Sequence, residues 1–454
     1  MATFEHVQDV IGQLPILKSY SHILICFAVS DEKREAAIQH IERAVRLVMK
    51  TFPYLSGKVI NEGSGSGSSG TFKVASSGEW ESSEHVFVRV EDRTDVCPSY
   101  EELCAAHGPS SLLPGHLLSA RKGFPESYQE TEDDPAPVLD FQANIVRGGL
   151  LLDLAAQHNI IDGTGIFQIV NLLATALRGD KFPLFQIHEG NRDRRSLIRL
   201  LGPDEPLLDH SELKPPVIIK APPPPEVLAP YKWRYYRFPL DSVNKIRELA
   251  NNKPEDFDPS TTSISLNDAI TAFCWQRITT IRLKRLETPT AYSKLSRAVD
   301  FRRVMKLTPA YLGHMVRICN TRLTFQEIVN SSLSRLASLL RKAVQEISKE
   351  YALRSYVTFI ANEPDKSDIA YGGSFNPQTD FSCSSIAHVK VPDFGPLGTP
   401  GLIRRPTFGP LPCSSYVAPM LHGEGMEALV CLHENDIEAL AADESWKELV
   451  EYVG

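Results

Sequence analysis

Three stretches in the first half of the chain have the hydrophobic spacing of regular secondary structure. Residues 38–52 carry apolar side chains at intervals of three and four, which predicts an amphipathic helix that ends before Pro53. The continuous apolar run at residues 150–156 predicts a buried strand. Residues 166–177 repeat the helical spacing, and Gly179 then acts as a stop signal. A buried strand is thus followed closely by a buried helix.

The second half shows the same alternation of strands and helices. Residues 235–240 read as a strand, residues 241–251 as a helix, and residues 265–283 as a long helix with apolar positions at Leu266, Ala269, Ile270 and Phe273. Alternating strands and helices in both halves predict an α/β protein built of layers with mixed sheets.

The length of 454 residues favours two domains of about 200 residues each, because single cores stop growing near that size. Residues 191–230 are rich in proline, which predicts an extended linker. We therefore expect an N-terminal domain at residues 1–190 and a C-terminal domain at residues 231–454. Residues 61–70 are almost entirely glycine and serine, which predicts a flexible hairpin loop inside the first domain.

Composition and charge narrow the class of protein. Hydrophobic residues make up 42% and charged residues 23%, which is ordinary for a globular protein. The net charge of -8 argues against a general nucleic-acid binder, although a local basic patch for a phosphorylated cofactor stays compatible with it. No apolar run reaches the roughly 20 residues that span a bilayer, and the first 13 residues lack the basic flank of a signal peptide. We expect a cytoplasmic protein with no membrane partner.

The eight cysteines lie far apart, with no Cys-x-x-Cys pair and no adjacent histidine cluster. They predict free thiols and no metal site. Cys383 and Cys413 are conceivable nucleophiles, but no neighbouring pattern activates either of them.

The segment that follows the buried strand carries the strongest chemical signal, with His158, Asp162 and Gly163 in the order His-x-x-x-Asp-Gly. A histidine at the end of a rigid strand can be held neutral and can take the proton of an attacking alcohol or amine. The aspartate, near a helix start, can fix the turn. Because so short a pattern often arises by chance, a structural histidine is the competing interpretation.

Further motifs give this pattern its context. They are Phe141-Gln142-Ala143-Asn144, Gly148-Gly149, Ser265-Leu266-Asn267-Asp268-Ala269 with Trp275, Asp300-Phe301-Arg302-Arg303, Tyr311-Leu312-Gly313 and Val391-Pro392-Asp393-Phe394-Gly395. In this order, over nearly the whole chain, they resemble the BAHD acyl-CoA-dependent acyltransferases, and most of all the fungal branch that includes the trichothecene 3-O-acetyltransferases.

This resemblance implies two similar domains, each related to chloramphenicol acetyltransferase, with the active-site channel between them. Acyl-CoA enters from one face and the acceptor from the other, and no metal takes part. The histidine that corresponds to His158 is the general base of a direct transfer without an acyl-enzyme. We expect a monomer that moves a short acyl group, such as acetyl, from acyl-CoA to a hydroxyl of a small secondary metabolite.

The resemblance also implies structural roles for the two motif aspartates. Asp162 is expected to point away from the channel and to pair with Arg302 or Arg303, in competition with a catalytic dyad that would orient His158. Asp393 and Gly395 are expected to form a distant structural turn. A kinase Asp-Phe-Gly is excluded, because no glycine-rich loop and no His-Arg-Asp catalytic loop accompany it.

The chain departs from the family pattern in three places. Pro396 and Leu397 replace the Trp-Gly that follows Asp-Phe-Gly in plant members. Ser382 and Ser384 stand where many members have Thr-Ser-Trp, so they are candidate donors to the oxyanion, in competition with a polar strand end without a catalytic part. His314 occupies a position where asparagine is frequent, and we interpret it as a harmless substitution.

Candidate cofactor contacts are groups that can bind phosphate, namely helix N-terminal amides and basic side chains. Ser265 and Asn267 open a helix whose N-terminal amides suit phosphate. The basic pairs Lys284-Arg285 and Arg404-Arg405 are candidate phosphate partners, although each pair alone reads equally as a solvated surface feature. The acceptor pocket is expected to involve the loops at residues 96–137 and 371–380.

Three other functions compete with this one. A condensation-like transferase would use an acyl donor on a carrier protein, but such sites usually have two adjacent histidines, and Gln157 precedes His158 here. An N-acyltransferase would differ only in the attacking atom. A noncatalytic binding protein is disfavoured by the intact motif.

Overall fold

The computed structural model describes residues 2–78, 81–126, 131, 135–218 and 223–454. Residues 219–222 of the predicted linker lie outside the described residues. The same holds for residues 127–130 and 132–134 of the predicted acceptor loop at 96–137.

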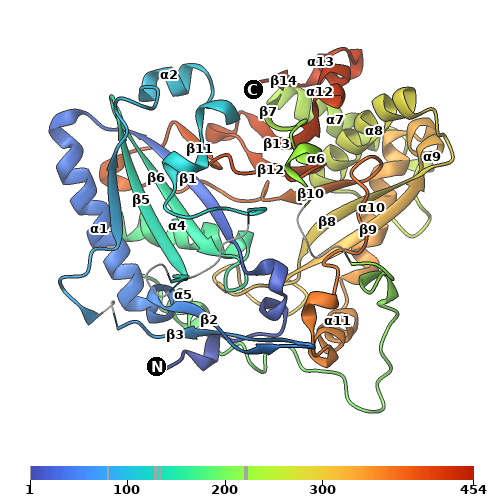
Figure 1. Cartoon of the computed structure of the whole chain (residues 1–454). Coiled ribbons are helices and arrows are strands. Elements are labelled where there is room, and N and C mark those ends of the chain that lie inside the picture. Colours follow the sequence, from blue (N-terminus) through green and yellow to red (C-terminus); the bar gives the residue numbers. More distant parts are fainter. Residues whose placement is uncertain (1, 79–80, 127–130, 132–134, 219–222) are drawn as a thin grey trace.

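The first sheet has five strands among the described residues, in the order β11-β1-β6-β5-β4. These strands are β1 (Tyr20–Ala28), β4 (Val88–Asp92), β5 (Leu139–Val146), β6 (Gly149–Gln157) and β11 (Leu402–Arg404). Helices α1 (Arg34–Thr51) and α4 (Gly163–Leu177) share its hydrophobic core and lie with it in the left half of Figure 1. The helices predicted at residues 38–52 and 166–177 are thereby confirmed.

Strand β6 is the centre of this sheet, paired on both sides and buried at all nine residues. Leu150, Leu152, Leu154 and Ala156 face the core that contains α1 and α4. The alternate residues of the strand are turned to the opposite face by the two-residue period of a strand. Burial on both faces explains why the sequence is continuously apolar here and not alternating.

The second sheet has seven strands among the described residues, in the order β14-β7-β13-β12-β10-β8-β9. They are β7 (Tyr231–Pro239), β8 (Tyr292–Asp300), β9 (Val316–Thr324), β10 (Phe381–Ser385), β12 (Ser414–Pro419), β13 (Gly425–His433) and β14 (Glu451–Tyr452). Helices α7 (Leu240–Asn251), α8 (Leu266–Leu286) and α10 (Leu333–Ile347) pack on one face and share its core, in the right half of Figure 1. The strand and both helices predicted for this half are confirmed.

The remaining helices are short or peripheral. They are α2 (Tyr100–Ala105), α3 (Gly115–Leu118), α5 (Leu184–Gly190), α6 (Pro225–Leu228), α9 (Phe325–Asn330), α11 (Glu350–Asn362), α12 (Glu434–Ala441) and α13 (Glu444–Leu449).

The two halves of the chain exchange one strand. β11 comes from the second half of the sequence but pairs antiparallel with β1 at the edge of the first sheet. Just before it, Phe394 is fully buried in the first core, with its ring centroid 5.0 Å from that of Phe27. A division of the chain at residues 191–230 therefore does not separate the two sheets completely.

The glycine- and serine-rich stretch at residues 61–70 forms strands, so the prediction of a flexible loop is wrong. Strands β2 (Lys58–Gly65) and β3 (Ser68–Ala75) pair antiparallel as far as Gly65 and Ser68. Cross-strand hydrogen bonds join backbone groups, which glycine and serine possess like any other residue. The loop is reduced to a two-residue turn, in which Gly67 adopts a φ of +73°.

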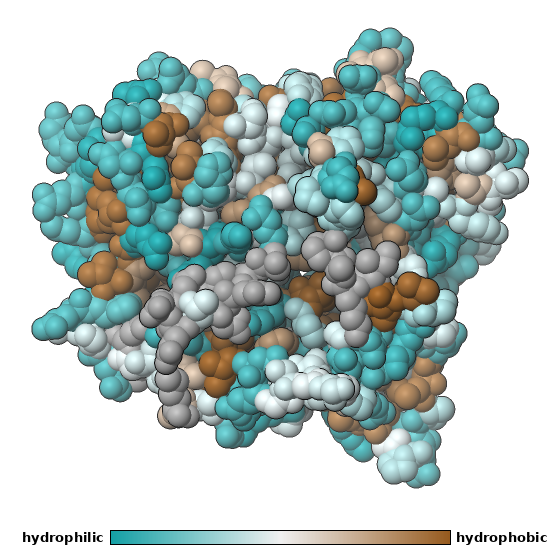
Figure 2. All heavy atoms as spheres, viewed as in Figure 1, coloured by the Kyte–Doolittle hydropathy of each residue, from teal (hydrophilic) through white to brown (hydrophobic). Residues whose placement is uncertain are grey.

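On the face shown in Figure 2, hydrophobic residues lie in separate patches among hydrophilic ones. Among the described residues, no helix combines the length and the apolar character that crossing a bilayer requires.

Candidate active site

The turn after β6 is held by backbone hydrogen bonds. The His158 N–H donates to the carbonyl of Ser19 at 2.7 Å. The N–H groups of Ile160 and Ile161 both donate to the carbonyl of Gln157 at 3.0 Å. We call residues 157–162 the catalytic turn, since it carries His158 at one end and Asp162 at the other.

The His158 imidazole is partly exposed, whereas its Nδ1 is buried and has no hydrogen-bond partner on another described residue. The exposed edge of the ring is therefore the one that carries Nε2. Burial lowers the pKa of His158 below the usual 6.5, and it outweighs the opposite effects of the residue's own backbone carbonyl and of the Asp162 carboxylate. The imidazole is neutral at pH 7 and can accept a proton.

Asp162 is the N-cap of α4, where its Oδ1 accepts from the Gly165 N–H at 2.8 Å. Both of its oxygens also accept from Arg302, each at 2.8 Å, and Oδ2 accepts from the Met315 N–H at 2.8 Å. Burial alone would raise the pKa of Asp162, but the charge and hydrogen bonds of Arg302 lower it to about 2. The carboxylate is thus fully engaged as a brace, and its ion-pair partner is Arg302.

Arg302 extends this brace to the second half of the chain. Its guanidinium also donates to the carbonyls of Tyr311 and Gly313 and to Asp300 at 2.8–3.1 Å. The motifs at residues 300–303 and 311–313, far from His158 in sequence, therefore meet at the start of α4.

His314 lies beside His158, with 5.3 Å between the ring centroids and 43° between the ring planes. Its Nδ1 accepts from the Val316 N–H, which leaves the ring proton on Nε2. Burial and the neighbouring His158 lower the pKa of His314 to about 3, so this ring is neutral too. The sequence analysis interpreted His314 as a harmless substitution and missed that it lies next to His158. The signal that could have revealed this is the Tyr311-Leu312-Gly313 motif, which directly precedes His314.

The candidate oxyanion donors lie on β10. Both serines are partly exposed, and the Ser382 hydroxyl donates to the Ser414 hydroxyl at 2.9 Å. Ile386, just after β10, comes within ordinary contact distance of the position a Cβ would take on Gly163. The end of β10 is thus brought to the catalytic turn, and Ser384 lies closer to that end than Ser382.

The Asp-Phe-Gly segment lies at the far end of α4. The Arg178 guanidinium donates to the Asp393 carbonyl at 2.5 Å, and the Gly395 N–H donates to the Asp393 carboxylate at 2.9 Å. Gly395 has a φ of +58°, a conformation that favours glycine. Since α4 has 15 residues and Asp162 caps its other end, about 22 Å of helix separate this turn from the catalytic turn.

The four cofactor candidates on α8 fall into two places. Ser265 is the N-cap and exchanges hydrogen bonds with Asp268, which occupies its hydroxyl, while Asn267 Oδ1 is buried with no hydrogen-bond partner among the residues that the structure describes. Lys284 and Arg285 lie in the last turn of this 21-residue helix, roughly 30 Å away. The two pairs therefore cannot hold the same phosphate group.

The alternative basic pair is not a solvated surface feature. Arg404 is buried and pairs with Glu427, and it donates to the carbonyls of His107 and Gly108. The Arg405 guanidinium lies 5.3–5.4 Å from three aromatic ring centroids, and its Nη1 is buried with no hydrogen-bond partner on a described residue.

Among the described residues, no three histidine, cysteine or acidic side chains lie close enough together to bind a metal ion.

Comparison with known proteins shows to which protein family this chain belongs. A model described as the trichothecene 3-O-acetyltransferase-like N-terminal domain matches residues 19–177, and the Transferase family model matches residues 119–447. The chain belongs to the BAHD transferase family. The resemblance seen in the motifs is confirmed, and the chain is an acyltransferase.

Curated relatives of this BAHD protein are fungal. The chain is 46% identical to the O-acyltransferase pigD of Monascus ruber over 454 residues, which covers 98% of each chain. It is 39% identical to the O-acetyltransferase epaC of Aspergillus niger, over 98% of this chain and 96% of that one.

A solved structure of the family has the same fold. The crystal structure of Fusarium sporotrichioides TRI101 in complex with coenzyme A and T-2 superposes with a TM-score of 0.87 at 30% identity, covering 98% of this chain and 99% of that one. The prediction of a two-part mixed α/β fold of this family is confirmed.

Proposed function

We propose that this BAHD acyltransferase uses acyl-CoA to acylate a hydroxyl of a small secondary metabolite, with a short acyl group such as acetyl and with His158 as general base. The observation that carries the proposal is the state of His158, which is neutral, exposes its Nε2 edge and stands on a turn braced by Arg302. Relatives named as O-acyltransferase and O-acetyltransferase and the coenzyme A complex of TRI101 support the donor and the acceptor class.

The chemistry follows from these positions. A thioester is already activated, so the site has to deprotonate the acceptor and stabilise the oxyanion. His158 Nε2 takes the hydroxyl proton as the oxygen attacks the thioester carbonyl. When the tetrahedral intermediate collapses, the carbon–sulfur bond breaks and the thiolate receives that proton from His158, which gives the ester and free CoA thiol.

Asp162 does not take part in proton transfer in this proposal. Its two oxygens already accept four hydrogen bonds, from Arg302, Met315 and Gly165, so none is left to orient the imidazole. For the oxyanion, Ser384 is the better placed of the two serines, because Ser382 already donates to Ser414. For acyl-CoA, Asn267 is more available than Ser265 at the start of α8, because its Oδ1 has no hydrogen-bond partner among the described residues and can accept from an N–H of the co-substrate, whereas the Ser265 hydroxyl is occupied by Asp268.

The test measures the release of free CoA thiol from acetyl-CoA by the purified full chain, with a panel of hydroxylated terpenoids, alkaloids and phenolics. The His158→Ala variant is the main control. The His188→Ala variant is a second control with the same substitution, because the His188 side chain is 78% exposed and lies outside the site. We expect acceptor-dependent release in the wild type and in His188→Ala, and its loss in His158→Ala.

Product analysis separates the competing activities. An ester confirms O-acylation, whereas an amide assigns the N-acyltransferase. Release only from an acyl group loaded on a carrier protein assigns the condensation-like enzyme. No transfer from any donor by the folded protein would contradict the proposal.

A further inference from the structure

Arg194 is a second arginine, besides Arg302, that contacts the catalytic turn. It lies in the proline-rich stretch that the sequence marks only as a linker, yet it is just 3% exposed. Neither the motifs nor the chemistry of acyl transfer assigns it a role.

The contacts of Arg194 join four parts of the molecule. Its Nη1 donates to the carbonyl of Ile160 in the catalytic turn at 2.8 Å and to the carbonyl of Val7 at 3.4 Å. Its Nη2 donates to the Tyr54 hydroxyl at 3.3 Å. The guanidinium also lies over the rings of Tyr54 and Tyr311, 5.3 and 5.7 Å from their centroids. Such a set of donors and stacking contacts fixes a planar guanidinium in one place.

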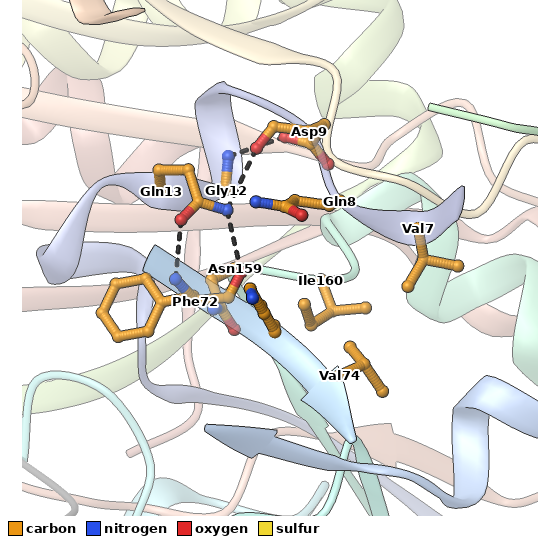
Figure 3. Close-up of a pocket in the computed structure, with 10 residues that line it drawn as sticks. Val7, Gln8, Asp9, Gly12, Gln13, Phe72, Val74, Asn159 and Ile160 are labelled. Atoms are coloured by element: carbon orange, nitrogen blue, oxygen red, sulfur yellow. Dashed lines mark hydrogen bonds between the residues drawn. The ribbon is translucent and has the colours of Figure 1, made fainter. Parts of the chain in front are cut away.

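The N-terminal segment, residues 5–17, presses on the same side of the turn. A Cβ on Gly12 would lie 2.2 Å from the carbonyl oxygen of Asn159, so the two backbones are in direct contact. Figure 3 shows residues that line the adjoining cavity, among them Val7, Asp9 and Gly12 of the N-terminal segment and Asn159 and Ile160 of the catalytic turn. The catalytic turn therefore packs directly against this N-terminal segment.

This cavity has a volume of about 10 Å³, which is room for about one water molecule. Asp9 Oδ2 and both polar side-chain atoms of Asn159 are buried and have no hydrogen-bond partner among the described residues. Arg194 Nη1 is 4.0 Å from Asp9 Oδ2, so the positive charge of Arg194 also lies close to this polar cavity. Arg194 therefore reaches the catalytic turn directly, through its 2.8 Å hydrogen bond to the Ile160 carbonyl.

We propose that Arg194 is a positioning residue for His158, which holds the catalytic turn through the Ile160 carbonyl while Arg302 holds it through Asp162. This inference rests on the proposed role of His158. Without Arg194 the buried Ile160 carbonyl would lose its charged donor, and the turn would be free to shift. A displacement of about 1 Å at a catalytic group can cost about 100-fold in rate.

The test is a graded series in the full chain, with Arg194→Lys and Arg194→Met. Arg195→Met is the matched control, because Arg195 is half exposed and its ion pairs within the described part of the chain are with Asp193 and Glu5. We measure kcat and KM for acetyl-CoA with the first acceptor that the wild type acylates. In ¹⁵N-histidine NMR spectra we also follow the His158 ring signal, assigned by its absence in His158→Ala.

We expect kcat to fall by up to about 100-fold in Arg194→Met, with KM for acetyl-CoA little changed. Arg194→Lys should fall between this variant and the wild type, because one ammonium cannot reach Ile160, Val7 and Tyr54 together. The His158 ring signal should shift in the same order, and Arg195→Met should match the wild type.

A wild-type kcat and an unshifted His158 signal in a folded Arg194 variant would overturn the inference. If Arg194→Met does not fold, the kcat and the His158 ring signal of Arg194→Lys decide whether the inference holds. If no acceptor is found, the proposed function fails by itself, and the His158 signal still reports on Arg194.

Discussion

The imidazole of His314 lies 5.3 Å from that of His158, centroid to centroid, and both rings are neutral at physiological pH. Two imidazoles at this distance, His314 buried and His158 partly exposed, disfavour a second positive charge, so a proton on His158 keeps His314 unprotonated. One ring is therefore free to gain and lose a proton while its neighbour stays a neutral hydrogen-bond donor.

The first prediction concerns the pH profile. Because burial lowers the pKa of His158, the protonated, inactive form should dominate only below a midpoint that lies under pH 6.5. His314, with a pKa of about 3, should add no second step above pH 4. We expect kcat/KM to rise with pH through one proton and then to level off. A midpoint above 6.5, or a two-proton slope, would contradict this assignment.

The second prediction concerns the ion pair between Asp162 and Arg302. Asp162→Asn leaves the buried Arg302 guanidinium with the partly exposed Asp300 as its remaining charged partner among the described residues, so we expect a loss of up to about 3–5 kcal/mol in the free energy of unfolding. Asp300→Asn is the comparison, because the Asp300 side chain is 31% exposed and its loss should cost less. Urea unfolding of both variants measures the difference. Equal losses would show that burial does not set the strength of this pair.

The third prediction concerns Asp9, whose pKa is raised by burial to about 6. A carboxyl with a raised folded-state pKa favours the folded state at low pH, and this contribution is lost as the pH rises from about 4 through 6. Asp9→Asn should therefore be more stable than the wild type at pH 8, by up to about 3 kcal/mol, and no more stable at pH 4. Thermal unfolding across this range provides the measurement. A variant less stable at pH 8 would show that the charge helps the fold.

The fourth prediction contrasts two glycines in the first turn of α4. Alanine usually stabilises a helix by about 1 kcal/mol relative to glycine. At Gly165, however, a Cβ would lie 2.5 Å from the Leu312 carbonyl oxygen, whereas at Gly163 its nearest neighbour is 3.8 Å away. Gly165→Ala should lower the unfolding temperature and Gly163→Ala should not. The reverse order in calorimetry would mean that the 312–315 segment can move away from α4.

The local elements of this protein follow from its sequence alone. The apolar run of β6 and the three- and four-residue spacing in α1, α4, α7 and α8 specify those elements, because burial on one or both faces leaves a periodic trace. The motif order specifies the family. The hairpin at the glycine- and serine-rich stretch was predicted, but the length of its strands was not, because their pairing uses backbone groups, which leave no such trace.

The surroundings of His158 were decided only by the tertiary structure. Arg302 was one of two candidate partners of Asp162, and the bidentate contact selected it. His314 looked like a harmless substitution and Arg194 like part of a linker, yet the fold sets both against the catalytic turn. Such contacts join residues tens to hundreds of positions apart, and their directions depend on how two sheets and an N-terminal segment pack. Periodicity along the chain reports which face of an element is buried, but not which residue of another element meets it there.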